Sequence, residues 1–217
     1  MLEVALSILN ELYDTGYTAY IIGGFVRDSF IGLKSTDIDI TTSATPNVIK
    51  NMYEVIDDNS KYGSLRIKRD GFVFEITTFR HELSYSGRFP KIEFTNSLIE
   101  DLKRRDFTIN TICMDKDKSI IDLMGGIEDI EKKLIRSVGD ADVKLMEDPL
   151  RILRAIRFMG YLDFKLEEEL ERAIIKNKDL VKTLSKKRIK NEISKMNEKS
   201  INKLNELNIK EELWRTK

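Results

Sequence analysis

The feature that most constrains the fold is a β-rich run that ends in two glycines and leads into a short helical segment. AYIIGG occupies residues 19–24, and FVRDSFIG follows it. Gly23 and Gly24 leave backbone N–H groups open, and a helix start carries partial positive charge, so such a turn is suited to hold phosphate. Arg27, one turn into the helix, would add a charged fork for a triphosphate. The alternative is a tight turn with a surface arginine.

Two aspartates follow nine residues after Asp28, in the run DIDIT. In a β-strand, residues i and i+2 face the same side, so Asp37 and Asp39 should converge while Ile38 and Ile40 point into the core. Paired carboxylates suit Mg²⁺, which takes its other ligands from water and substrate phosphates. Two such ions would serve a phosphoryl-type displacement, one acting on the attacking hydroxyl and one on the leaving pyrophosphate. The alternative is an exposed acidic strand face.

A third acid, Glu75, alternates with apolar residues in the strand pattern FVFEITTF. That position favours a third carboxylate facing the same metal ions, which would make Glu75 catalytic. It equally favours a salt bridge with Arg66 or Arg80, and the sequence leaves both interpretations open.

Composition limits the kind of site and its location. The chain has 217 residues, 41% of them hydrophobic, which is enough for a packed core. With one cysteine, Cys113, and one histidine, His81, it lacks a zinc-binding set, so any metal must be held by carboxylates. No apolar run approaches the roughly 18 residues of a membrane span, and Glu3 stands where a secretion signal carries positive charge. We therefore expect a cytoplasmic protein without a membrane partner.

The order of the patterns predicts an α+β domain followed by an all-α domain, with a boundary near residue 140. Residues 2–16 have helical spacing and end in Gly16, and residues 64–80 form a hairpin pattern turning at Asp70-Gly71. These and the neighbouring runs predict a mixed, partly antiparallel sheet. Residues 80–90, RHELSYSGRFP, are polar without periodicity and predict a mobile loop. From residue 147 onward every signal is helical.

The C-terminal segment is basic. Residues 182–217 hold eleven Lys/Arg and five Glu, which gives them a net charge of +6 and leaves −6 for the rest of the chain. Such a segment marks a polyanion-binding surface or a solvated helix face. The side chains that would contact such a polyanion are Lys186, Lys187, Arg188 and Lys190, and contacts of this kind weaken with added salt.

Several motifs in order resemble the bacterial-type, class II tRNA nucleotidyltransferase and poly(A) polymerase family, from about residue 20 to 193. They are GGFVRD, DIDITTSATP, EITTFR, EDLKRRDFTIN, the pair Gly139-Asp140, and EDPLRILR. The resemblance implies a polymerase-β-like nucleotidyltransferase head over residues 1–140 and a helical neck over residues 141–217. It implies addition of C, C and A, from CTP and ATP, to the 3′ end of tRNA without a nucleic-acid template.

The resemblance also implies roles for individual residues. Asp37 and Asp39 would hold two Mg²⁺ ions. Nucleotide contacts are implied for Gly24, Arg27, Arg105, Asp106, Asn110, Asp148, Arg151, Arg154 and Arg157. For Arg104 and Arg105 the alternative is a helix C-terminal charge pair favoured by the dipole.

The implied base-reading pair has a physical rationale. Asp148 and Arg151 are i and i+3 on one helix, so they should hold one another. The acid only accepts and the arginine only donates, which complements cytosine and adenine and leaves groups unpaired opposite guanine and uracil. The alternative is an exposed helical salt bridge, but Arg154 and Arg157 continue the same ridge. So much positive charge suggests a bound anion.

The chain departs from the family in places. Tyr62-Gly63-Ser64 stands where relatives usually have His-Gly-Thr, and Thr36 replaces a lysine; neither is expected to touch the core chemistry. The chain stops about where the neck should end, which fits a shortened chain, a natural minimal form, or a chain whose missing surface comes from a second copy or a partner. The basic segment with Lys186, Lys187, Arg188 and Lys190 would then carry much of the RNA contact. The loop at residues 80–90 favours CCA addition over CC-only addition. A-only addition, poly(A) synthesis and a non-catalytic RNA-binding module remain alternatives.

Overall fold

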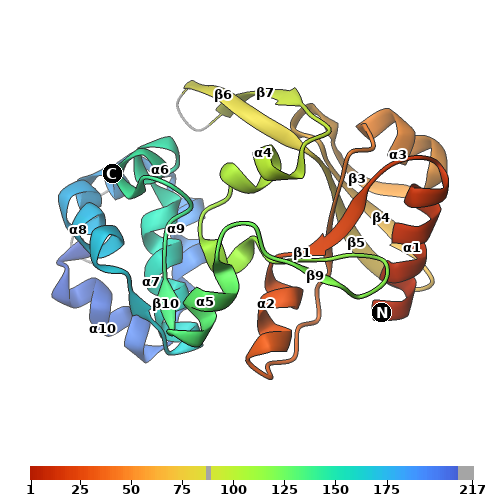
Figure 1. The fold of residues 1–217 in the computed structure, drawn as a ribbon. Coiled ribbons are helices and arrows are strands. Elements are labelled where there is room, and N and C mark those ends of the chain that lie inside the picture. Colours follow the sequence, from red (N-terminus) through yellow and green to blue (C-terminus); the bar gives the residue numbers. More distant parts are fainter. Residues whose placement is uncertain (87–88, 210–217) are drawn as a thin grey trace. The chain divides into compact units, whose positions relative to one another are not determined.

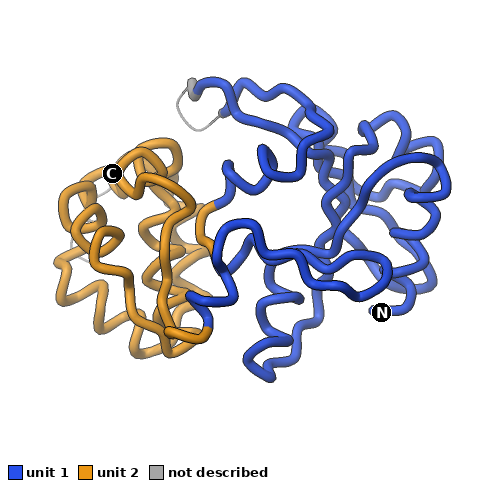
Figure 2. Tube along the Cα trace, in the orientation of Figure 1, with its two compact units in different colours: residues 1–105, 109–130 blue, residues 106–108, 131–217 orange. Residues whose placement is uncertain are grey.

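The computed structural model describes residues 1–86 and 89–209, and its contacts divide the chain into two compact units (Figure 2). Unit 1 comprises residues 1–105 and 109–130, and unit 2 comprises residues 106–108 and the chain from residue 131 onward. The continuous part of unit 2 therefore begins at residue 131, before the domain boundary predicted near residue 140. The position of that domain boundary stays a prediction. Within the described ranges, no helix is long and apolar enough to span a lipid bilayer.

Unit 1 is built on a seven-stranded mixed sheet (Figure 1). Its strands are β1 (Ala19–Ile22), β2 (Asp39–Thr42), β3 (Val55–Asn59), β4 (Ser64–Arg69), β5 (Phe72–Thr78), β8 (Cys113–Met114) and β9 (Ile120–Ile121). Their order is β3-β4-β5-β2-β1-β8-β9. β2 and β5 run parallel, and the other neighbouring pairs are antiparallel. The predicted mixed sheet is therefore confirmed.

The helices of unit 1 are short except for the first. They are α1 (Leu2–Asp14), α2 (Gly24–Phe30), α3 (Pro46–Met52), α4 (Leu98–Lys103) and α5 (Gly126–Glu131), with 3₁₀ turns η1 (Ser60–Tyr62) and η2 (Thr108–Asn110). α1 ends as predicted at Gly16, whose φ is +89°. The Gly16 N–H donates to the Tyr13 carbonyl and the Tyr17 N–H to the Leu12 carbonyl, each over 2.9 Å, which is a Schellman motif.

The predicted hairpin between β4 and β5 is confirmed. Asp70 and Gly71 have φ of +49° and +79°, as a two-residue type I′ turn requires. Arg69 and Phe72 pair across the turn, so the register is fixed at its tip.

The prediction of an irregular mobile loop at residues 80–90 is wrong for its described residues. β6 (Arg80–Ser86) and β7 (Phe89–Phe94) form a separate antiparallel ribbon, and the loop's remaining residues, 87 and 88, lie outside the described ranges. Among the described side chains of this ribbon, Leu83 and Phe94 are exposed while the charged Arg80 and Glu82 are largely buried. Because strand prediction relies on apolar residues on the buried face alternating with polar residues on the solvated face, this hairpin gave no signal.

Unit 2 is mainly helical. It contains α6 (Ala141–Glu147), α7 (Leu150–Leu162), α8 (Glu168–Asn177), α9 (Lys186–Ile193), α10 (Glu198–Glu206) and the 3₁₀ segment η3 (Lys178–Thr183). Two strands that the sequence did not predict, β10 (Leu134–Ile135) and β11 (Lys165–Leu166), pair in parallel. α7 and α10 cross closely at Gly160, whose carbonyl accepts a 2.8 Å hydrogen bond from Asn197 Nδ2.

Candidate active site

The glycine turn and the first strand place Asp39 beside a helix start. Gly23 has φ of +82° and is the N-cap of α2. β1 pairs with β2 so that Ile22, the residue before the turn, lies opposite Asp39. A Cβ added at Gly23 would stand 3.6 Å from Asp39 Oδ2. The carboxylate therefore lies directly against the turn that was predicted to hold phosphate.

Asp37 and Asp39 share a side of the chain, although not a regular strand. Both are exposed while Ile38 and Ile40 are each 1% exposed, so the predicted alternation holds. The ladder, however, begins only at Asp39, and Asp37 lies in the preceding irregular segment. The prediction that one strand carries both acids is wrong, because β2 begins two residues after Asp37.

Glu75 is the immediate neighbour of Asp39 across the sheet. The two residues are register partners on the parallel strands β2 and β5, so both side chains leave the same face. Glu75 Oε1 accepts a 2.7 Å hydrogen bond from Ser64 Oγ. Arg80, one of its predicted salt-bridge partners, instead pairs with Glu82 and the Tyr62 carbonyl. Arg66, the other predicted partner, lies directly opposite Glu75 on β4, so these positions leave both interpretations open.

The negative charges of Asp37, Asp39 and Glu75 lie near one another, and this changes the pKa of Asp39. Desolvation by the surrounding protein, the charge of Glu75 and that of Asp37 raise the pKa of Asp39 from 3.8 to about 6, against the opposing charge of Arg105. Among the described residues, no group of three or more His, Cys, Asp or Glu side chains is arranged to hold a metal ion. Repelling carboxylate oxygens are nevertheless the ligands that Mg²⁺ prefers, and a divalent cation would relieve the repulsion. The donor type therefore suits magnesium, although the described side chains do not form a ready-made set of three ligands.

Arg27 is buried at 4% exposure rather than projecting from the helix. Its Nε and Nη2 donate to Asp28 Oδ1 at 2.9 and 2.7 Å, and its Nη1 donates to Asn110 Oδ1 at 2.6 Å. Two residues predicted to contact the nucleotide, Arg27 and Asn110, are thus joined in unit 1. The sequence did not indicate that Asp28 balances the arginine charge.

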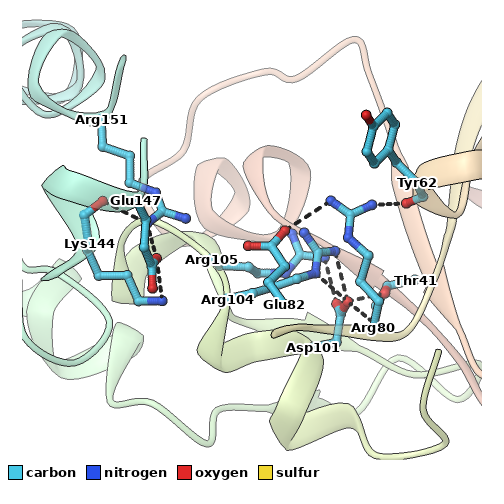
Figure 3. Close-up of polar contacts among 10 residues, drawn as sticks. All are labelled: Thr41, Tyr62, Arg80, Glu82, Asp101, Arg104, Arg105, Lys144, Glu147 and Arg151. Carbon is cyan, nitrogen blue, oxygen red and sulfur yellow. Dashed lines mark hydrogen bonds and ion pairs between the residues drawn. The ribbon is translucent and has the colours of Figure 1, made fainter. Parts of the chain in front are cut away.

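Arg105 lies in a cluster around a fully buried acid, Asp101 (Figure 3). Asp101 Oδ2 is 3.2 Å from Arg105 Nη2, and Oδ1 accepts from Arg104 Nε at 2.8 Å. Thr41 Oγ1 donates to Oδ2 over 3.0 Å. Arg104 and Arg105 therefore share one buried acid. Neither Asp101 nor Thr41 was predicted from the sequence to belong to the site.

In unit 2, Asp106 and Arg154 form one pair. Arg154 Nε donates to Asp106 Oδ2 over 2.7 Å, and Nη2 contacts the same oxygen. Asp106 Oδ1 accepts from the Phe107 N–H over 2.8 Å. The two predicted nucleotide residues are brought together although 48 positions separate them.

Asp148 and Arg151 do not hold each other as predicted. Arg188 Nη2 lies 3.1 and 2.9 Å from the two Asp148 oxygens, and Asp148 Oδ1 also accepts from the Leu150 N–H over 3.1 Å. Arg151 Nη1 donates to Glu147 Oε2 at 2.7 Å and to the Lys144 carbonyl at 2.8 Å (Figure 3). The i+3 spacing permitted a contact, but each side chain has a partner elsewhere.

The three arginines along α7, Arg151, Arg154 and Arg157, are each paired with a carboxylate of the protein itself. Arg157 Nε donates to Glu192, and its guanidinium lies 4.1 Å from the centre of the Phe158 ring. With the Glu147 and Asp106 pairs, each of the three ridge arginines contacts a protein carboxylate. The inference that the ridge must recruit an external anion is therefore not required.

The predicted RNA-binding residues on α9 are of two kinds. Lys186, Lys187 and Lys190 are exposed, as phosphate contacts would need. Arg188 is partly buried and is engaged by Asp148. Their charge is therefore not one uniform patch.

Comparison with known proteins places the chain in a family. Residues 19–136 match the poly A polymerase head domain, and residues 163–197 match the probable RNA and SrmB-binding site of polymerase A. The first match covers more than half of the chain. The chain belongs to the family of bacterial-type tRNA nucleotidyltransferases and poly(A) polymerases.

Individual relatives support this assignment. The chain is 46% identical over 195 residues to the CCA-adding enzyme of Lactobacillus johnsonii, covering 88% of this chain and 49% of the relative. The crystal structure of the Bacillus stearothermophilus CCA-adding enzyme in complex with CTP matches with a TM-score of 0.84 at 41% identity, over 89% of this chain and 47% of that one. A tRNA nucleotidyltransferase complexed with a primer tRNA and an incoming ATP analog matches with a TM-score of 0.79 at 30% identity, over 96% and 62%.

These matches confirm the polymerase-β-like nucleotidyltransferase head followed by a helical neck. The chain spans about half the length of the curated relatives it matches.

Proposed function

We propose that this chain is a template-independent tRNA nucleotidyltransferase that adds C, C and A from CTP and ATP to the 3′ end of tRNA and releases pyrophosphate. One observation carries the proposal: the Asp39 carboxylate lies against the Gly23 turn and next in register to Glu75. Phosphate-binding backbone and metal-binding acids are thus adjacent in unit 1. The names of the relatives, which are CCA-adding enzymes, support the choice of reaction.

The proposal gives the residues of unit 1 the chemical step. Asp37 and Asp39 hold magnesium, and Glu75 is the third catalytic acid. Two ions bound there would lower the pKa of the attacking 3′ hydroxyl and neutralise the leaving pyrophosphate. The backbone at Gly23 and Gly24 faces the phosphates, since glycine lets them approach closely.

The remaining nucleotide contacts of unit 1 are positively charged or amide side chains. In the proposal they orient the phosphates and the ribose, and they are Arg27, Arg105 and Asn110. Arg27 also pairs with Asp28 and donates to Asn110, and these contacts hold its guanidinium in place for that task.

The proposal gives unit 2 the choice of base. Asp148, held by Arg188, offers acceptors, and Arg151, held by Glu147, offers donors. Cytosine and adenine present the complementary edge, whereas guanine and uracil would leave these groups unpaired. Asp106, Arg154 and Arg157 support the same pocket. Because each is fixed by a protein partner, the pocket is preorganised.

tRNA is the proposed partner, bound by α9 through Lys186, Lys187 and Lys190 to the phosphate backbone. Binding should weaken steeply with added salt, and a flat dependence would contradict it. A cytoplasmic location and an assembly with a second copy or a partner chain belong to the same proposal. The assembly is tested by the mass in solution with and without tRNA.

The experiment that tests the function supplies Mg²⁺, labelled CTP or ATP, and tRNA ending at the discriminator base, at C or at CC. CCA addition extends all three substrates. A-only addition extends only the last, CC-only addition stops before A, and poly(A) synthesis continues beyond it. A non-catalytic RNA-binding module would bind tRNA without transfer.

Variants then locate the chemistry. Asp37→Ala and Asp39→Ala should each abolish transfer, while Asp57→Ala, which removes an exposed acid from β3, should transfer as the parent does. Full transfer by either of the first two variants would refute the proposed enzyme.

A further inference from the structure

Asp101 is a buried acid with four donors around one carboxylate. It is 0% exposed, in the first turn of α4. Thr41 and Arg105 reach Oδ2, and Arg104 and the Arg80 backbone N–H reach Oδ1, the last over 3.3 Å (Figure 3). Burial alone would raise the pKa of Asp101, but Arg104 and Arg105 outweigh it and hold the pKa below its ordinary value. The carboxylate is therefore ionised.

The cluster joins the strand of the catalytic acids to Arg105. Thr41 follows Asp39 by two residues on β2, so both side chains leave the same face of the sheet. Asp101 binds Thr41 and Arg105 through the same oxygen. The charge of Arg105 acts directly on Asp39. One carboxylate thus sets how far the guanidinium lies from the catalytic strand.

Arg105 also has a donor left over. Its Nε is buried and has no hydrogen-bond partner among the described residues. Buried donors are nearly always satisfied, so the guanidinium is held by Asp101 at the cost of one unmade hydrogen bond. Removing one partner of a buried ion pair is strongly destabilising, so a structural role has to be separated from a positioning role by experiment.

We propose that Asp101 is a positioning residue for nucleotidyl transfer, which, with Thr41, fixes the Arg105 guanidinium near Asp39 in the orientation in which its accessible edge contacts the incoming nucleotide. The inference rests on the proposed function. Asp101 itself touches no substrate and acts through Arg105.

The test compares Asp101→Asn and Thr41→Val with Glu100→Gln. The last is the matched control, because Glu100 precedes Asp101 on α4 and pairs with Lys103 at the surface. The KM for CTP, kcat and the melting temperature are measured for each. Asp101→Asn should raise the KM about tenfold, since it disturbs a charge-assisted contact. Thr41→Val should raise it about threefold with little change in melting temperature, Thr41→Ser should restore it, and Glu100→Gln should match the parent.

A purely structural role predicts a lower melting temperature with an unchanged KM. A double variant separates the two roles further: in an Arg105→Ala background, Asp101→Asn should change the KM less than about twofold, because its effect passes through Arg105. If Asp101→Asn does not fold, Thr41→Val and Thr41→Ser decide. An active parent whose folded variants keep the parental KM overturns this inference alone, whereas a parent that transfers no nucleotide overturns the proposed function with it.

Discussion

The Ser64 hydroxyl donates a 2.7 Å hydrogen bond to Glu75 Oε1, and Glu75 lies next to Asp39 in the sheet. Ser64 ends the Tyr62-Gly63-Ser64 segment, one of the two departures from the family motifs. That segment was expected to leave the core chemistry untouched. The contact instead connects it to the third proposed catalytic acid.

Ser64 should therefore influence the rate. Ser64→Ala removes the hydrogen bond that orients Glu75, and kcat should fall about five- to tenfold, which corresponds to the usual net worth of a single hydrogen bond, about 1 kcal/mol. Ser64→Thr keeps the hydroxyl and should stay within about twofold of the parent. Single-turnover transfer of CTP measures both. Equal rates for all three proteins would show that Glu75 needs no such orientation.

The raised pKa of Asp39 predicts a pH dependence for metal binding. Because a protonated carboxylate is a poor ligand, Mg²⁺ affinity should fall as pH drops below about 6, and it should be about tenfold weaker at pH 5 than at pH 7.5. Calorimetric titration with Mg²⁺ at several pH values measures it. A midpoint near the ordinary value of 3.8 would contradict the crowded site.

The raised pKa of Asp39 also predicts that the stability of the metal-free protein falls as pH rises, whereas Mg²⁺ affinity increases. A carboxyl whose pKa is raised by folding contributes stability below its ordinary pKa of 3.8 and loses it as pH rises through about 6. Without divalent ions, Asp39→Asn should therefore gain melting temperature relative to the parent as pH rises from 4 to 7. Parallel melting curves across this range would argue against the shift.

Arg188 should affect base choice more than RNA affinity. Arg188→Gln removes the partner of Asp148, so UTP misincorporation relative to CTP should rise about tenfold while the tRNA Kd changes little. Lys190→Gln, on the exposed side of α9, is the matched control: it should weaken tRNA binding and reduce the salt slope by about one. If Arg188→Gln instead weakened tRNA binding and Lys190→Gln raised UTP misincorporation, Arg188 would belong with the RNA-binding lysines.

Gly160 should be intolerant of a side chain. A Cβ there would stand 2.1 Å from Ser200 Oγ and 2.8 Å from the Ser200 backbone nitrogen. Gly160→Ala should therefore cost about 1–3 kcal/mol in free energy of unfolding, despite the better helix propensity of alanine. Chemical denaturation measures this cost. Adding Ser200→Ala should recover only part of it, because the backbone atom remains, and full recovery would show that the helices shift freely.

Local chemistry explains which features the sequence predicted. The turn at Asp70-Gly71, the α1 end at Gly16 and the burial of Ile38 and Ile40 depend on neighbouring residues, so short patterns were sufficient. The β6–β7 ribbon was missed because its described residues lack the usual alternation: Leu83 is exposed while the charged Arg80 and Glu82 are largely buried.

Partners that lie far apart in the chain depend on tertiary structure and were not predictable in this way. Asp101 meets Thr41 across 60 positions, and Arg157 meets Glu192 across 35. Other pairs have helical spacing and could have been recognised in the sequence, namely Asp101 with Arg105 and Glu147 with Arg151.

The ion pair between Asp148 and Arg188 spans forty residues and joins the start of α7 to α9. One helix consequently carries lysines facing solvent and the arginine that anchors the proposed base-selecting acid. With the roles proposed for these residues, a movement of α9 that alters its RNA-binding surface would also displace Arg188 from Asp148 and so change the choice of nucleotide.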